Sequence, residues 1–474
     1  MREGWRKRFT IVLMDEISVD AALTRYAEVD LPDTDVALRS VLAIDPDAQR
    51  RTAGVAHADG PLHGVPVLVK DNIEAAGLPC TAGSLALQGI PIHGDSTVAK
   101  RLRQAGAVII GASNLSEWAN IRSTRSSSGW SAVGGLVSNP WALDRSAGGS
   151  SSGSGAAVAA GIVPMAVGTE TDGSITCPAA LNGVVGIKPT VGVIPTDGIV
   201  PVSGSQDTPG PIARSIDEAE LMLAVLSDDP SLLSRSRNVD VSALSVGIVD
   251  AWRTAHSKTD EIFDVAVQLI KSLTTKVSAS SIPVTPDSVH ADEFTVLVHE
   301  LRSDLDAYLA GRTAGREPLT IESIIQFNQL NKDAELKHFG QEIFELAAQS
   351  HGRQAQDYID ARQRNVSWVD NALGTAFKEY DILVAPAYMP AWKTDFALGH
   401  PPAGGAVTSP AAIGGFPIVT IPTGLVAGLP VGLSLVGAKN SEALLIAFAR
   451  SLEKSLGLVD DSAWRPRFIP PSRG

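Results

Sequence analysis

The segment Gly64-Val65-Pro66-Val67-Leu68-Val69-Lys70-Asp71-Asn72 indicates the fold class of this chain. Its centre is a short uninterrupted run of apolar residues, which is typical of a strand buried on both faces of a sheet. Further along, a helix is predicted over 95–106 and a second buried strand over 107–111. Alternation of buried strands and helices favours a layered α/β/α fold with a large central mixed β-sheet.

The same reasoning extends to both ends of the chain. Residues from about 15 to 55 are predicted to be helical, and Leu115–Asn120 is predicted to begin another helix. A helix over 441–456 is expected to close the core. Before it, three apolar runs predict strands at Ile382–Pro386, Ile418–Pro422 and Val431–Val436.

The region from about 215 to 380 differs in character, because it is charged, helix-periodic and poor in glycine turns. We therefore expect it to be a helical insertion on the α/β core. The expected organisation is one domain over 1–474, with its core at about 60–220 and 381–456.

Composition limits the class of protein. The 474 residues are 44% apolar and 19% charged, which is globular composition with ample material for a core. The net charge of −13 argues against nucleic acid as a main partner, because phosphate binding needs a basic face. The two cysteines, Cys80 and Cys177, are too few for a disulfide framework or a zinc site, and we expect free thiols.

Neither end of the chain nor its interior predicts membrane association. The N-terminal apolar run Phe9–Met14 is shorter than the core of a signal peptide and is followed by Asp15 and Glu16. No apolar stretch reaches the roughly 20 residues of a membrane span. We therefore expect a soluble, cytoplasmic protein, present as a monomer or a homodimer.

The common catalytic patterns are weak in this sequence. Gly149–Gly153 matches Gly-x-Ser-x-Gly, but a nucleophile elbow needs a buried strand before it, and 139–145 reads poorly as one. The nine histidines are scattered, and no His-Glu-x-x-His, Walker A or complete Gly-x-Gly-x-x-Gly motif occurs. A histidine-based triad is therefore not predicted, and we expect neither a metal nor an organic cofactor.

Two polar elements remain that could carry chemistry. Lys70 directly follows the predicted strand, where it is either a solvated charge at the strand end or a partly buried amine whose pKa is lowered toward that of a base. The segment Gly148–Ser154 leads into an Ala-rich stretch. A flexible linker fits this position poorly, whereas a turn opening a helix would present N–H groups and hydroxyls.

A third element is the loop 168–176, in which Ser174 follows Gly173. A serine after glycine in a tight loop can expose its hydroxyl while neighbouring backbone N–H groups converge on one point, as an oxyanion hole requires. Taken alone, the same residues also fit an ordinary surface turn.

Together these elements resemble the amidase signature family. The matching segments occur in the family's order and cover about 60–440, most densely 60–220. They are Gly64–Pro66 with Val69–Asn72, Gly148–Ser154, Gly168–Ser174, Gly186–Pro189, Asp207–Pro211 and Gly415–Pro417. The resemblance implies an amidase that cleaves carboxamide bonds through an acyl-enzyme, with Ser174 as nucleophile, Ser150 after a cis peptide bond as proton relay, and Lys70 as general base. It places the oxyanion hole at the backbone of Thr171, Asp172, Gly173 and Ser174.

The sequence also departs from the common family pattern around the nucleophile. At the positions of Asp172, Gly173 and Thr176, commoner members of the family have Gly, Gly and Arg, respectively. This variant, with Asn114–Trp118 and Ser126–Trp130, looks like that of bacterial peptide amidases, which remove the C-terminal amide of peptides. Asp172 would either orient the amide nitrogen or Lys70, or only fix the loop.

Two other activities are compatible with the same resemblance. The first is an arylamidase or carbamate hydrolase with the same triad, because the chemistry at the carbonyl is shared. The second is the glutamine amidotransferase subunit that works on charged tRNA, which the variant at Asp172 disfavours.

Overall fold

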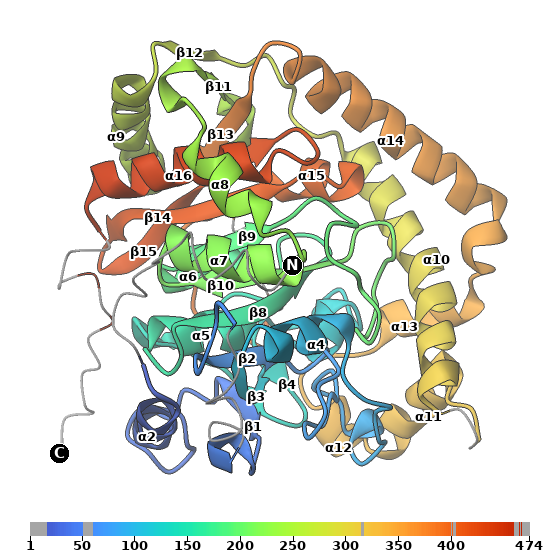
Figure 1. The fold of residues 1–474 in the computed structure, drawn as a ribbon. Helices are drawn as coiled ribbons and strands as arrows, with labels where there is room; N and C mark the ends of the chain where they lie inside the picture. Colours follow the sequence, from blue (N-terminus) through green and yellow to red (C-terminus); the bar gives the residue numbers. More distant parts are fainter. Residues whose placement is uncertain are drawn as a thin grey trace.

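The computed structural model describes residues 17–50, 60–313, 317–399, 401, 404–458, 464 and 466. Its centre is an 11-stranded mixed sheet with the strand order β1-β3-β2-β8-β10-β9-β14-β15-β13-β11-β12 (Figure 1). The strands are β1 (Val41–Ile44), β2 (Pro66–Lys70), β3 (Val108–Ser113), β8 (Met165–Glu170), β9 (Val185–Lys188), β10 (Thr208–Ala213), β11 (Ser245–Ile248), β12 (Lys276–Ala279), β13 (Ile382–Pro386), β14 (Ile418–Val426) and β15 (Leu429–Gly437). Two small hairpins lie outside it: β4 (Trp130–Ser131) with β5 (Gly135–Leu136), and β6 (Ser138–Asn139) with β7 (Ala142–Ser146).

Helices cover both faces of the sheet, as a layered α/β/α fold requires. They are α2 (Val19–Val29), α4 (Thr97–Gln104), α5 (Ser152–Ala159), α6 (Thr176–Asn182), α7 (Ile216–Leu226), α8 (Ser231–Arg237), α9 (Ser257–Leu273), α10 (Asp287–Arg312), α11 (Ile321–Leu330), α12 (Lys332–Glu335), α13 (Glu342–Gln349), α14 (Gln356–Ala376), α15 (Thr408–Gly414) and α16 (Glu442–Leu456). One large apolar cluster joins the sheet to α4, α7, α8, α9 and α16. Other clusters join the opposite face to α2, α5 and α6, and to α14 and α15.

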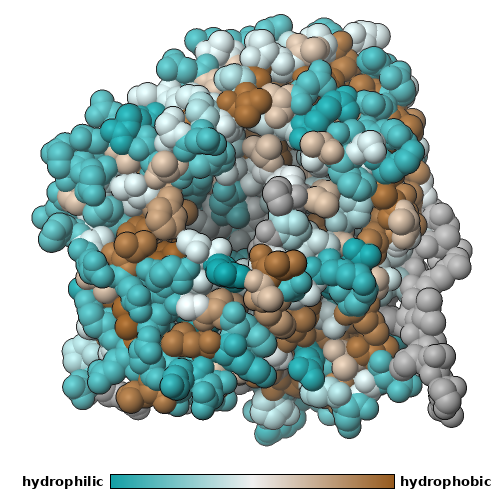
Figure 2. All heavy atoms as spheres, turned by 180° about the vertical axis from the view of Figure 1, so that it is seen from behind, coloured by the Kyte–Doolittle hydropathy of each residue, from teal (hydrophilic) through white to brown (hydrophobic). Residues whose placement is uncertain are grey.

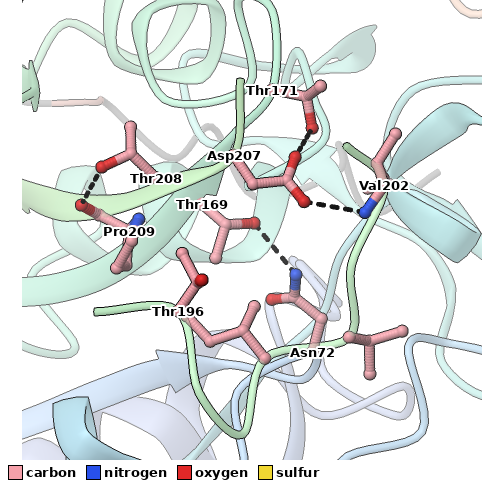
Figure 3. A pocket seen from close by; sticks show the side chains of 11 residues that line it. Asn72, Thr169, Thr171, Thr196, Val202, Asp207, Thr208 and Pro209 are labelled. Atoms are coloured by element: carbon pink, nitrogen blue, oxygen red, sulfur yellow. Dashed lines mark hydrogen bonds between the residues drawn. The ribbon is translucent and has the colours of Figure 1, made fainter. Parts of the chain in front are cut away.

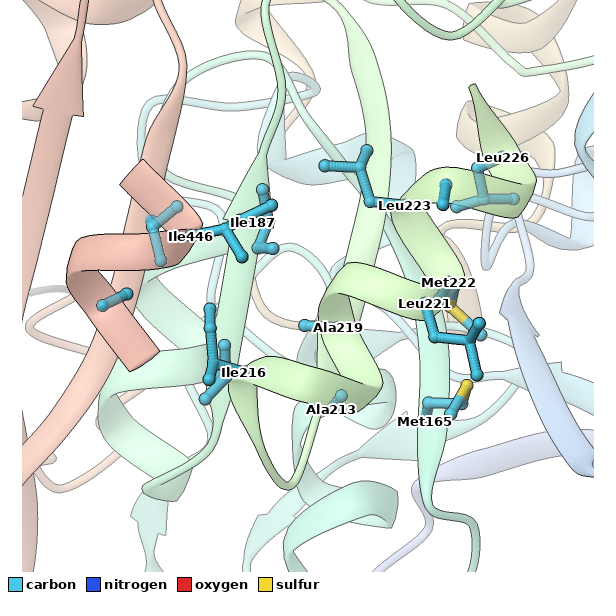
Figure 4. Packing of buried hydrophobic residues seen from close by; sticks show 14 of the residues in the cluster. Met165, Ile187, Ala213, Ile216, Ala219, Leu221, Met222, Leu223, Leu226 and Ile446 are labelled. Atoms are coloured by element: carbon cyan, nitrogen blue, oxygen red, sulfur yellow. The ribbon is translucent and has the colours of Figure 1, made fainter. Parts of the chain in front are cut away.

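The packing under α7 shows how the core is built (Figure 4). Met165 of β8, Ile187 of β9 and Ala213 of β10 meet the apolar side chains of α7, with Ile446 of α16 beside them. Successive strand residues point to opposite faces, so the fully apolar strands predicted from the sequence supply both layers of the core.

Most predicted elements of the core are confirmed. The structure has strands β2, β3, β13, β14 and β15 and helices α4 and α16 at the predicted places. Both cysteines are free and buried, as expected. Among the described residues, no helix is long and apolar enough to cross a membrane.

Three predictions of secondary structure were wrong. The region from about 15 to 55 is not continuous helix, because α2 ends at Val29 and Val41–Ile44 forms β1; residues 51–59 lie outside the described residues. The Asp30 carboxylate accepts hydrogen bonds from the N–H groups of Ser40 and Val41 at 2.7 and 2.9 Å. This side chain therefore fixes the turn that leads the chain into the sheet.

Leu115–Asn120 does not begin an α-helix either. Glu117–Asn120 is a single 3₁₀ turn in which Trp118, Ala119 and Asn120 have positive φ angles of 49, 54 and 72°. Tertiary hydrogen bonds hold this turn, since Ser116 N–H donates to the Ser150 carbonyl at 3.0 Å and Trp118 N–H to the Ala82 carbonyl at 2.9 Å.

The third correction concerns the region 215–380, which is not wholly a helical insertion. β11 and β12 belong to the main sheet, and α7 packs directly on it. The long helices α10 and α14 do lie together along one side of the molecule (Figure 1). Short strands with exposed positions, such as Lys276–Ala279, carry too few apolar residues to stand out from a charged helical region.

Candidate active site

Three segments from different parts of the sequence converge at one edge of the sheet. β2 and β8 are parallel neighbours, with Val69 opposite Val167, so Lys70 at the end of β2 lies beside Thr169 near the end of β8. Helix α5 begins just after Ser150 and Ser151, and α6 begins just after Ser174. The Ser151 N–H donates to the Ser174 carbonyl at 3.1 Å, which ties the two serine loops together.

The Lys70 amine is fully buried and has three polar contacts. Nζ donates to Ser150 Oγ at 2.7 Å, to Thr169 Oγ1 at 2.8 Å and to the Thr169 carbonyl at 3.2 Å. Burial lowers the pKa of Lys70 to about 7, although the charges of Asp207 and Glu170 act in the opposite direction. The solvated alternative is therefore wrong, and near neutral pH this amine is available as a base.

Ser150 is buried, and its carbonyl accepts a hydrogen bond from the Ser116 N–H at 3.0 Å. The Gly149–Ser150 peptide bond is cis, and a Cβ on Gly149 would lie 2.3 Å from Ser116 Oγ, so only glycine fits there. β7, the strand before this loop, has exposed residues, so the buried strand of a nucleophile elbow is missing here.

The loop before α6 contains backbone N–H groups that are bound and others that are not. Glu170 Oε2 accepts from the N–H groups of Ile175 and Thr176 at 2.7 and 2.9 Å, which anchors the end of the loop. Within the described residues, no acceptor is found for the backbone N–H groups of Thr171, Asp172, Gly173 and Ser174. Ser174 itself is only 7% exposed. The loop can therefore offer several unpaired donors to an oxygen bound beside Ser174.

The Asp172 side chain is tied to helix α15. Its Oδ2 accepts from Ser409 Oγ at 2.6 Å, whereas its Oδ1 is buried without a partner in the part of the chain that the structure describes. The contact with Ser409 supports a role of Asp172 in fixing the loop.

A small pocket lies beside Thr169, and its lining includes Asn72, Thr171 and Asp207 (Figure 3). Asn72 Nδ2 donates to Thr169 Oγ1 at 3.0 Å there, and Thr171 Oγ1 donates to Asp207 Oδ1 at 2.6 Å. The face of the molecule opposite to that of Figure 1 is hollowed near its middle (Figure 2).

Comparison with known proteins agrees with this geometry. The family model described as Amidase matches residues 18–446. The chain belongs to the amidase family. It is 37% identical to the peptide amidase of Stenotrophomonas maltophilia, with a TM-score of 0.85 and coverage of 96% of this chain and 94% of that one. It is 36% identical to a peptide amidase solved with the competitive inhibitor chymostatin, with a TM-score of 0.86 and coverage of 95% of both chains.

Relatives found by sequence comparison include an amidotransferase subunit and a plant amidase. The matching subunit of the glutamyl-tRNA(Gln) amidotransferase of Symbiobacterium thermophilum is 33% identical over 433 residues, covering 85% of each chain. A probable amidase of Arabidopsis thaliana is 33% identical over 415 residues, covering 83% of this chain and 77% of that one. Family membership and fold are thus shown, whereas the substrate differs among these relatives.

The structure adds site residues that sequence reasoning missed. Thr169 and Asp207 both lay inside motifs of the amidase family, but nothing in the sequence showed that they flank Lys70. Ser409 and Tyr388 reach the nucleophile loop from the C-terminal third of the chain, and both lie outside the segments that match the family.

Substituting Gly173 by alanine should lower kcat/KM at least about tenfold, because the loop would have to shift. Gly173 has a φ of +79°, and a Cβ there would lie 2.5 Å from the Tyr388 hydroxyl. The measurement is amide hydrolysis by the purified variant together with its thermal unfolding.

Gly192→Ala is the matched control, because Gly192 has a φ of +90° but open space around its Cβ position. It should cost about 1 kcal/mol of stability and leave kcat/KM unchanged. Adding Tyr388→Phe to Gly173→Ala should restore part of the activity. Wild-type activity in the single Gly173→Ala variant would contradict the assigned loop geometry.

Proposed function

We propose that this protein is an amidohydrolase that removes the C-terminal amide from peptide amides, with Ser174 as nucleophile, Ser150 as proton relay and Lys70 as general base. The observation that carries the proposal is the buried Lys70 amine, whose Nζ lies 2.7 Å from Ser150 Oγ. A lysine with this pKa can take a proton near neutral pH, which the ordinary solvated side chain cannot.

In the first half-reaction, Ser174 Oγ attacks the carbonyl carbon of the substrate amide. Its proton passes to Ser150 Oγ, while the proton of Ser150 passes to neutral Lys70. The carbonyl oxygen becomes an oxyanion and accepts hydrogen bonds from the N–H groups of residues 171–174. The C–N bond then breaks as the proton returns from Lys70 through Ser150 to the nitrogen, so ammonia leaves and Ser174 carries an ester.

In the second half-reaction, a water molecule attacks the ester carbon. Its proton moves along the same path to Lys70, and the second oxyanion is stabilised by the same donors. When the C–O bond to Ser174 breaks, the proton returns through Ser150 to Ser174 Oγ. The products are a carboxylic acid and ammonia, and the enzyme regains its initial protonation state.

The peptide-amide substrate is favoured by the solved relatives. Two peptide amidase structures match nearly the full chain at 36 and 37% identity, above the 32 and 33% of the amidotransferase subunits. An arylamidase or carbamate hydrolase would use the same residues, so the site does not separate these activities. A glutamine amidotransferase subunit is the less favoured alternative.

A substrate panel tests the proposal directly. The panel contains a C-terminally amidated dipeptide, a primary aryl amide, an anilide and free glutamine, and ammonia or aniline is measured. We expect ammonia from the dipeptide amide at the highest kcat/KM. If only the aryl amide or the anilide is hydrolysed, the proposed substrate is wrong and the protein is an arylamidase. If only glutamine is hydrolysed, the amidotransferase activity is favoured.

The pH dependence of the wild-type enzyme follows from the base assigned here. Lys70 must be neutral to accept a proton, so kcat/KM should rise about tenfold per pH unit below pH 7 and level off above it. The rise in kcat/KM should have an apparent pKa of about 7, because burial lowers the pKa of Lys70 to about that value. A rate profile that is flat or falls between about pH 6 and about pH 9 would contradict a neutral lysine base.

A further inference from the structure

The carboxylate of Asp207 accepts three hydrogen bonds, from donors in two different loops. Oδ1 accepts from Thr171 Oγ1 at 2.6 Å, and Oδ2 accepts from the Val202 N–H at 2.8 Å (Figure 3). Oδ2 also accepts from the Ser203 N–H at 3.0 Å. Asp207 thus joins the loop before β10 to the first residue of the loop that carries Ser174. Its position has little freedom, because three hydrogen bonds fix one short side chain.

The sheet register places this carboxylate near the Lys70 amine. β10 pairs antiparallel with β8, with Thr208 opposite Glu170 and Pro209 opposite Thr169, while Lys70 contacts Thr169 from the other side. Two carboxylates act on Lys70, and Asp207 has the larger effect of the two. Glu170, the other, is already bound to the N–H groups at the start of α6. Asp71, next to Lys70 in the chain, is turned toward Thr81.

Helix α10 holds the Asp207 loop from outside. Three acidic side chains on one face of α10 each bind it: Glu293 accepts from Gln206 Nε2 at 3.0 Å, Glu300 from Ser203 Oγ at 2.6 Å, and Asp304 from Gly204 N–H at 2.7 Å. Their spacing brings them to the same side of the helix. The loop is therefore a fixed part of the site wall.

We propose that Asp207 is a positioning residue of the hydrolytic site. Its carboxylate fixes Thr171 at the start of the oxyanion-binding loop, and its negative charge stabilises the protonated Lys70 that forms when Ser174 attacks. The inference rests on the proposed function, because it assigns Lys70 as the base. The charge effect is needed since a positive charge created in a buried site is costly without a compensating neighbour.

Two variants separate the charge from the position. Asp207→Asn keeps the size of the side chain but removes its charge, so the apparent pKa of the kcat/KM rise should fall by about 0.5 to 1 unit. Asp207→Glu keeps the charge but displaces Thr171, so kcat should fall about tenfold or more while the apparent pKa stays at the wild-type value. Burial raises the pKa of Asp207 itself to about 6, so its charge is present above that value. Both variants are assayed from pH 5 to 9 with a dipeptide amide.

Asp292→Asn is the control, because Asp292 also lies on α10 but binds Arg364 and has no contact with the Asp207 loop among the described residues. It should leave the apparent pKa unchanged. An unchanged apparent pKa in a folded Asp207→Asn variant overturns the charge role, and an unchanged kcat in Asp207→Glu overturns the positioning role. Should Asp207→Asn not fold, as judged by circular dichroism, the pH profile of Asp207→Ser, which also removes the charge, decides the charge role, and Asp207→Glu decides the positioning role.

The proposed function fails by a different result. If wild-type hydrolysis of the dipeptide amide persists in Ser174→Ala, the assigned nucleophile is wrong whatever Asp207 does. If hydrolysis depends on Ser174 but both Asp207 variants keep the wild-type profile and kcat, only the inference about Asp207 is wrong.

Discussion

Replacing Ser174 by alanine should lower kcat for a dipeptide amide by about 10⁴-fold or more, because the acyl-enzyme cannot form without the nucleophilic oxygen. The fold should be unaffected, since the Ser174 hydroxyl has no hydrogen bond to a described residue that the change would break. The stability change should stay within about 0.5 kcal/mol. Ammonia release under single-turnover conditions gives the rate, and thermal unfolding gives the stability.

A covalent probe gives an independent test of the same residue. A fluorophosphonate should modify wild-type enzyme once, and the added mass should lie on the peptide that contains Ser174. Ser234→Ala, on helix α8, is the matched control and should keep full activity and labelling. Full activity of Ser174→Ala, or labelling at another serine, would mean that the nucleophile is assigned wrongly.

The parts of the fold that were predicted correctly are those in which local sequence and tertiary environment agree. Strand β2 is buried on both faces, which is why Val67, Leu68 and Val69 are all apolar. A short run of apolar residues is therefore enough to predict the strand. β1 and the Glu117–Asn120 turn were missed for the opposite reason. Their conformations depend on distant partners, such as Asp30 for β1 and the Ser150 carbonyl for Ser116, which no local pattern reveals.

The same distinction applies to the site. Lys70, Ser150 and Ser174 were found because three separate motifs occur together in the order of a known family, and not because any one of them was decisive. Their meeting point depends on β2 and β8 being neighbours, which periodicity does not encode. The contacts from Ser409 and Tyr388 also come from tertiary packing alone, so only the structure could add them.

Lys70→Met should lower kcat by about 10³-fold or more, because Ser150 would have no base to take its proton. Methionine is apolar, and its length suits the fully buried position of Lys70. The variant should therefore fold, and its residual activity should lack the rise with an apparent pKa of about 7. Activity from pH 5 to 9 and circular dichroism test both expectations.

Unfolding measurements on the same pair of proteins test whether Lys70 is neutral. The pKa of Lys70 is lowered from 10.5 to about 7, so between these two values the unfolded wild-type chain binds more protons than the folded one. Its free energy of unfolding should then rise with pH across this window relative to that of Lys70→Met. Parallel pH dependences would mean that Lys70 stays protonated in the folded enzyme and cannot be the base. If the free energy of unfolding of wild type rises with pH relative to that of Lys70→Met, the Lys70 amine is neutral in the folded enzyme. If Lys70→Met is also inactive, this neutral amine is required for catalysis.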